Sequence, residues 1–248
     1  MIKCKLNPNY EDTFKEFLLN IKKYFQENTQ TIHKARNELK IIKHNSIDTI
    51  VKSFKVPNII NRIVYTFFRS SKTKKSYEYS LKIKDFTPKP IGYIEFYKYG
   101  LLYDSYFVSE RFDYDFTIRE PLLNDNFENK EDILKAFARF TYDLHEAGIF
   151  HNDYSPGNIL IKKDANKFIF KIVDINRMRF YNLPFKDRAK NFSKLWASDK
   201  ELKTIGKEYS KYANYDEISF IEQMQEFNNK NKSIKNFKKR LKGQKVVD

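Results

Sequence analysis

Apolar residues recur at two different periods along this chain. Spacings of three and four over Tyr10 to Glu27 predict an amphipathic helix, and shorter apolar runs after it predict strands. The predicted strands are Thr29–Ile32, Glu38–Lys43, Thr49–Phe54, Ile91–Tyr97 and Ser105–Glu110. We expect these strands to form one five-stranded sheet in the first part of the chain.

Two further helices are predicted between the third and fourth strands. The first presents an apolar face that we expect to lie in the core, made of Ile59, Ile60, Ile63, Val64, Phe67 and Phe68. The second covers Ser71 to Lys84 and stops before Thr87-Pro88-Lys89-Pro90, because proline cannot continue a helix.

The rest of the chain is predicted to be mainly helical. Glu131 to Ala147 has a buried side and is followed by Gly148, which suits a residue that ends a helix. Further helices are expected at Asp187–Trp196, Asp199–Tyr212 and Asp216–Asn228. Two short apolar runs, Ile159–Ile161 and Phe168–Val173, flank a polar turn and predict a hairpin. The order of elements therefore indicates an α+β chain.

Composition supports a packed globule. Hydrophobic residues make up 41% and aromatic residues 17% of the 248 residues, which argues against disorder. The single cysteine, Cys4, excludes an intramolecular disulfide, and no Cys/His spacing suggests zinc. Neither a signal peptide nor a run of about 18 apolar residues is evident, so we expect a cytoplasmic protein.

The chain is strongly basic. It has 47 basic and 32 acidic residues, a formal charge of +15, which favours polyanions as partners. Nucleic acid, an anionic membrane and a phosphorylated substrate all qualify, as does a soluble surface rich in lysine. No stacking or groove-reading motif is evident, so nucleic acid is not expected.

The chemistry concentrates between His151 and Asn176. Asp153 and Asn158 are five residues apart in a Pro-Gly loop, and Asp174 directly follows the second apolar run of the hairpin. Phosphoryl transfer from ATP needs a group that accepts the hydroxyl proton and oxygen ligands for Mg²⁺. Asp153 suits the first task, and Asn158 and Asp174 suit the second. The alternative is that these residues only cap loops, since Asp and Asn favour turns.

This spacing resembles the protein-kinase-like superfamily, in which His-x-Asp-x-x-x-x-Asn precedes a hairpin and an Asp-Phe-Gly metal ligand. Asp174-Ile175-Asn176 keeps the Asp and loses the Gly. The sequence of residues 152–160 and 174–180 most resembles that of the bacterial lipopolysaccharide kinases, which phosphorylate Kdo or heptose. The resemblance implies an α+β, two-lobed, kinase-like fold, with an N-lobe at 1–110 and a C-lobe at 111–248 that ends in a basic tail.

The same resemblance assigns roles in the N-lobe. Lys52 would grip the α and β phosphates of ATP, and Glu78 would be its ion-pair partner. The first ninety residues contain no glycine, so Lys34 and Arg36 would replace a glycine-rich phosphate loop by charge. Glu110 lies in Val108–Phe112, where a kinase hinge offers main-chain groups to adenine. Solvent-exposed side chains are the alternative for Lys52 and Glu78.

These features predict an ATP- and Mg²⁺-dependent kinase whose acceptor is a sugar hydroxyl of a lipopolysaccharide-type glycolipid. A Ser/Thr protein kinase is the nearest alternative, opposed by the missing glycine loop, by Ser155 and by the short segment after Phe180. A pseudokinase scaffold is opposed by the joint presence of Lys52, Asp153, Asn158 and Asp174.

The tail from Asn229 to Asp248 has seven lysines, one arginine and a single acidic residue. Its narrow apolar stripe consists of Ile234, Phe237 and Leu241. It fits a basic helix on the anionic cytoplasmic face of the inner membrane, a solvated last helix, or a frayed tail.

Overall fold

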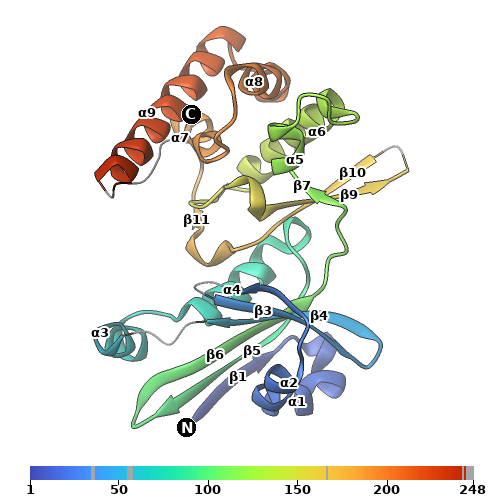
Figure 1. Cartoon of the computed structure of the whole chain (residues 1–248), viewed down its shortest axis with the longest axis vertical. Helices are drawn as coiled ribbons and strands as arrows, with labels where there is room; N and C mark the ends of the chain where they lie inside the picture. The colour runs from blue at the N-terminus through green and yellow to red at the C-terminus, as the bar shows by residue number, and fades with distance from the viewer. Residues whose placement is uncertain (35–36, 55–57, 166, 242, 244–248) are drawn as a thin grey trace. The chain divides into compact units, whose positions relative to one another are not determined.

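The computed structural model describes residues 1–34, 37–54, 58–165, 167–241 and 243. The chain divides into two compact units (Figure 1). The first unit comprises Met1–Asp113 and Asp174–Asn176, and the second comprises Tyr114–Val173 and Arg177–Asp248. Asp174 thus belongs to the unit formed by the first part of the chain.

The first unit is built on an antiparallel sheet that has six strands among the described residues, one more than predicted. Their order is β1-β5-β6-β4-β3-β2. The strands are β1 (Ile2–Leu6), β2 (Thr31–Lys34), β3 (Asn37–His44), β4 (Ile47–Phe54), β5 (Pro90–Lys98) and β6 (Leu101–Glu110). The additional strand, β1, is a short edge strand with mostly exposed side chains, so it lacks the apolar alternation that identifies a half-buried strand.

Helices cover both faces of this sheet. The helices α1 (Glu11–Leu19) and α2 (Ile21–Glu27) pack on the face that carries Val51, Ile94 and Val108. The helix α4 (Lys72–Ile83) packs on the other face, where the ring centroids of Tyr77 and Tyr93 are 5.4 Å apart. The unit therefore has a helix–sheet–helix arrangement.

Lys52 lies on the α4 face of the sheet. It is paired with Phe107 of β6, and Phe107 is paired with Tyr93 of β5. Directly paired residues of neighbouring strands project from the same face, and successive residues of a strand alternate between faces. Val51 is therefore turned to the α1–α2 core and Lys52 is turned away from it.

The apolar helical face at residues 59–68 is not core, which corrects the prediction. The segment forms a short α3 (Ile59–Ile63) followed by a π-helical turn, η2 (Val64–Phe68). Ile59, Ile60, Phe67 and Phe68 are between 63% and 78% exposed. The segment is attached to the sheet by polar contacts instead, since Arg62 Nε donates to the carbonyl of Leu102 at 2.9 Å. A pattern of apolar residues predicts an apolar helical face, but it cannot show whether another surface is available to bury that face.

The second unit is mainly helical. Its helices are α5 (Arg119–Leu123), α6 (Lys130–Glu146), α7 (Phe185–Asn191), α8 (Asp199–Ala213) and α9 (Glu217–Leu241). Among the described helices of both units, none is long and apolar enough to cross a membrane. The predicted helix Asp187–Trp196 is instead α7 followed by a 3₁₀ turn, η6 (Phe192–Lys194). The core of the second unit is aromatic, with Phe137, Phe192, Tyr209 and Phe220 each fully buried.

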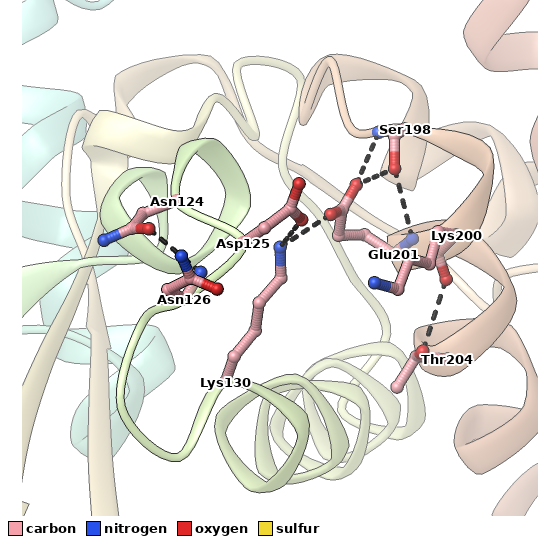
Figure 2. A network of polar contacts seen from close by, with 8 residues as sticks. All are labelled: Asn124, Asp125, Asn126, Lys130, Ser198, Lys200, Glu201 and Thr204. Carbon is pink, nitrogen blue, oxygen red and sulfur yellow. Dashed lines mark hydrogen bonds and ion pairs between the residues drawn. The ribbon is translucent and has the colours of Figure 1, made fainter.

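A polar network ties the beginnings of α6 and α8 together (Figure 2). Lys130 Nζ lies 2.8 Å from the buried Glu201 carboxylate and 2.9 Å from Asp125. Ser198 and Glu201 also form a capping box that satisfies the first N–H groups of α8. Burial alone would raise the pKa of Glu201, but hydrogen bonds from Lys130 and Ser198 hold it below its usual range.

Short strands complete the second unit. Within the described residues, β7 (Phe116–Thr117), β9 (Ile159–Asp164) and β10 (Lys167–Ile172) form one sheet, in the order β10-β9-β7. The strands β8 (Ile149–Phe150) and β11 (Arg179–Phe180) form a separate pair. The predicted hairpin is therefore present, and the loop between β8 and β9 is fixed at both ends.

Candidate active site

The loop from His151 to Asn158 joins β8 to β9 in the second unit. Gly148 reverses the chain after α6 with φ +70°, and a side chain there would approach the Tyr181 carbonyl to 3.0 Å. Glycine adopts this left-handed conformation without steric cost. The turn predicted at Gly148 therefore delivers the chain to His151.

His151 is buried and its ring fixes the start of the loop. Its Nε2 lies 3.0 Å from the Val173 carbonyl, and its Nδ1 lies 3.1 Å from the main-chain nitrogen of Asp153. A carbonyl only accepts and a main-chain N–H only donates, so Nε2 carries the proton and Nδ1 accepts. The neutral imidazole thus links Asp153 to the residue that precedes Asp174.

Asn158 closes the other end of the loop. Its Nδ2 donates to the main-chain carbonyl of Asp153 at 2.8 Å, and the N–H of Ser155 donates to the same carbonyl. The main chain of Asp153 is therefore held on both sides. Its carboxylate is only half-buried, and no hydrogen bond or ion pair joins it to another of the described residues.

A buried network that the sequence did not reveal supports the loop from behind. Asn191 Nδ2 donates to the His151 carbonyl at 2.9 Å, and Asn191 Oδ1 accepts from His145 Nε2 at 3.0 Å. His145 Nδ1 in turn accepts from the hydroxyl of Tyr209 at 2.9 Å. Burial lowers the pKa of His145 to about 3. These contacts join α6, α7 and α8, so no local spacing of residues could identify them.

Lys52 and Asp174 meet in the first unit. Lys52 Nζ lies 2.7 Å from Asp174 Oδ1, and Asn176 Nδ2 donates to the same oxygen at 2.9 Å. Asp174 has φ +56°, a left-handed conformation that Asp tolerates better than most residues. A cation and a carboxylate separated by 122 positions of the chain are therefore in direct contact.

Glu78 is not the ion-pair partner of Lys52, which corrects the predicted pair. It is exposed, and its carboxylate lies 3.7 Å from Lys74 Nζ, one turn earlier on α4. The buried side of α4 is formed by Thr73, Ser76, Tyr77, Ser80 and Ile83. Glu78 is not part of this buried side, and its only ion pair among the described residues is with Lys74.

The remaining predicted nucleotide-binding residues are less defined. Lys34 is the last residue of β2, and its main chain lies opposite that of Glu38 in the β2–β3 register. Arg36 lies outside the described residues. The main-chain N–H of Glu110 donates to the Lys89 carbonyl, and its carboxylate accepts from the hydroxyl of Tyr10 at 2.6 Å. The known hydrogen bonds of Glu110 are thus to protein groups, and its contact with adenine stays a prediction.

Two comparisons with known proteins gave matches. The family model described as "Lipopolysaccharide kinase (Kdo/WaaP) family" matches residues 79–216, more than half of the chain. The solved structure titled "WaaP in complex with acyl carrier protein" is similar over 92% of this chain and 99% of its own, with a TM-score of 0.60 and 13% identity. This structural likeness confirms the predicted α+β, kinase-like fold. A search of curated proteins gave no match. The chain belongs to the lipopolysaccharide kinase (Kdo/WaaP) family.

Proposed function

We propose that the protein moves the γ-phosphoryl group of ATP to a hydroxyl of Kdo or heptose in a lipopolysaccharide-type glycolipid. The observation that carries the proposal is the His151–Asn158 loop, which lies inside the region matched by the family and holds Asp153 with an unpaired carboxylate among the described residues. Membership of a kinase family supports ATP as the donor.

Asp153 is the proposed general base. Its carboxylate takes the proton of the sugar hydroxyl, whose oxygen then attacks the γ-phosphorus. The bond from the γ-phosphorus to the bridging oxygen breaks, and ADP leaves. The contacts of His151 and Asn158 fix the main chain of Asp153 before the acceptor arrives, which saves the entropy of positioning the base.

Lys52 and Asp174 are the proposed nucleotide-binding pair. The Lys52 ammonium suits the α and β phosphates, and its contact with Asp174 holds it in place on the α4 face of the sheet. Lys52 is mostly buried, with 14% of its side chain exposed, which strengthens its attraction for a phosphate relative to a lysine in water.

The available oxygen donors fit Mg²⁺. The proposed ligands are the amide oxygen of Asn158 and the carboxylate of Asp174, and Mg²⁺ prefers oxygen ligands and usually keeps several waters and phosphate oxygens. The described residues contain no cluster of three His, Cys, Asp or Glu side chains that could form a closed protein cage. When bound, Mg²⁺ would neutralise charge on the phosphates.

A panel of acceptors tests this function. The purified protein is incubated with ATP labelled at the γ-phosphate and with core glycolipid, free Kdo, heptose or casein. We expect label to enter the glycolipid or a sugar. Label in casein alone would favour a Ser/Thr protein kinase, and no label in any acceptor together with no ATP binding would favour a pseudokinase scaffold.

The C-terminal half of α9 is the proposed contact with the membrane that holds such an acceptor. This segment is helical as far as Leu241, so it is not a frayed tail in its described part. Ile234, Phe237 and Leu241 are 47%, 61% and 72% exposed. Their spacing and the surrounding lysines suit a helix that lies on an anionic bilayer.

A further inference from the structure

Three lysines from two elements of the second unit lie where α9 packs on η6, and two of them contact the ring of Trp196. Lys235 Nζ and Lys239 Nζ of α9 lie 4.8 Å and 5.6 Å from the centroid of the Trp196 ring. Lys194, at the end of η6, donates to Asn231 Oδ1 at 3.3 Å and so also faces α9. Asn231 Nδ2 in turn donates to the Ser193 carbonyl at 2.7 Å, which fixes α9 against η6.

The positive charge of this lysine cluster, Lys194, Lys235 and Lys239, is not balanced by a salt bridge. None of its members forms an ion pair with a described residue. Burial lowers the pKa of Lys235, and the charges of Lys194 and Lys239 lower it further. Like-charged ammonium groups held together by the fold disfavour one another, so a bound anion would relieve the repulsion.

The lysine cluster is anchored to the loop of the proposed general base, because Asn191, which directly precedes η6, donates to the His151 carbonyl at 2.9 Å. The negative charge of Asp153 acts on Lys235 and opposes the lowering of its pKa. Trp196 also has φ +60°, which is a genuine outlier for a bulky residue. Strained conformations of this kind persist where the surrounding structure enforces them, and they concentrate at binding sites. Charge and strain therefore coincide where α9 packs on η6, and η6 is anchored to the loop that carries Asp153.

We infer that Lys235, with Lys194 and Lys239, binds an anionic group of the acceptor, a carboxylate or a phosphate, while the hydroxyl to be phosphorylated reaches Asp153. This inference rests on the proposed function and specifies its substrate, because it requires an acidic or already phosphorylated sugar. The ammonium groups supply point charges that accept either anion. A neutral sugar has no anionic group with which these ammonium groups could form an ion pair.

Trp196 provides a direct readout, because it is the only tryptophan in the chain. The full-length protein is titrated, without ATP, with free Kdo, glucose 6-phosphate or a neutral heptose while Trp196 emission is recorded. We expect a saturable change with an anionic sugar and none with the neutral heptose over the same range. A response to Kdo alone would identify a carboxylate, and a response to glucose 6-phosphate alone would identify a phosphate.

The variant Lys235→Gln should weaken this binding by about 10- to 100-fold, the usual worth of a charge-assisted hydrogen bond. Lys230→Gln is the matched control, because it removes the same charge from the same helix at a lysine that does not contact the Trp196 ring. It should bind the anionic sugar as the wild type does. Equal responses to neutral and anionic sugars, or wild-type affinity in Lys235→Gln, would overturn the inference.

Steady-state kinetics separate this role from an action on ATP. Lys235→Gln should raise KM for the acceptor and leave KM for ATP unchanged. A rise in KM for ATP alone would place Lys235 on the nucleotide and contradict the inference. The titration needs no turnover, so the two proposals can be rejected independently. Phosphoryl transfer without anion binding would reject the subsite, and anion binding without phosphoryl transfer would reject the proposed function.

Discussion

Single residues in this protein are held with different degrees of constraint. The main chain of Asp153 is fixed by His151 and Asn158, while its carboxylate has no partner among the described residues. Asp174, in contrast, is bound through its carboxylate to Lys52 and Asn176. This difference fits a base that must exchange a proton and a ligand that must stay in place.

Removing the Asp174 carboxylate should abolish Mg²⁺-dependent ATP binding. It would delete both a proposed metal ligand and the partner that orients Lys52. Calorimetry of Asp174→Ala with ATP, with and without Mg²⁺, measures the effect directly, and unchanged affinity would remove Asp174 from the site.

Lys52→Met should lower kcat/KM for ATP by about 10²- to 10³-fold, as expected for the loss of one preorganised charge on a transferred phosphate. Lys43→Met is the matched control, since Lys43 is an exposed lysine on the neighbouring strand β3. A similar loss in both variants would show a general effect of charge.

Asp153, Asn158 and Asp174 could be proposed as site residues from the sequence, because their chemistry is encoded at fixed short spacing. The structure places Asp153 and Asn158 in one loop and Asp174 beside Lys52, while their roles in catalysis stay predictions. Glu78 was wrongly paired with Lys52 because the position of a carboxylate on the face of a helix depends on which side of the helix is buried. The lysine cluster was not foreseen, since Lys194 and Lys235 are brought together only by the packing of α9 on η6.

At the scale of elements, α6, α7 and α8 meet through the buried side chains of His145, Asn191 and Tyr209. Sequence periodicity predicted α6 and α8 because each has an apolar face. It could not place the polar residues that lock them together, because these form pairs between helices distant in the chain. The exposed apolar residues of α3 and η2 show the converse failure, in which a helical apolar pattern exists but its face is not buried.

The His145 network predicts a specific pH dependence of stability. The folded pKa of about 3 lies below the unfolded value of about 6.5, so the unfolded state binds the proton more readily. Neutral His145 makes its full contribution to the free energy of unfolding above about pH 6.5. As the pH falls, the free energy of unfolding decreases by about 1.4 kcal/mol per pH unit, or by roughly 2 kcal/mol at pH 5.

Urea unfolding of the wild type and His145→Gln tests this dependence. The pH is varied from about 7 to about 5, a range in which an ordinary histidine titrates. The variant should be less stable at neutral pH, because buried partners lose their hydrogen bonds, and its stability should fall less with decreasing pH. Parallel pH profiles for the two proteins would contradict the assignment.

At the scale of the whole molecule, a charge of +15 is combined with an exposed apolar stripe on α9. Each lysine or arginine close to an anionic bilayer contributes about 1 kcal/mol, screened over about 8 Å at physiological salt. Removal of the entire tail would also break packing, since Asn231 and Lys232 hydrogen-bond the carbonyls of Ser193 and Ala197. Substitution of the exposed stripe is therefore the cleaner experiment.

The double variant Phe237→Ser/Leu241→Ser should bind less to anionic vesicles and phosphorylate membrane-embedded acceptor more slowly. Activity on a delipidated acceptor should be unchanged. The exposed Leu123 of α5 offers a matched control, Leu123→Ser. Equal co-sedimentation of the double variant and the wild type at low salt would exclude the stripe as the membrane contact.

The central claim is that Asp153 accepts the proton of a sugar hydroxyl during transfer from ATP. The decisive measurement is the turnover of Asp153→Asn on the phosphorylated acceptor, made together with its affinity for ATP. Asp164→Asn, an exposed carboxylate at the end of β9, is the control. We predict that Asp153→Asn lowers kcat by about 10²- to 10⁴-fold and binds ATP as the wild type does. Wild-type turnover in Asp153→Asn would contradict the claim.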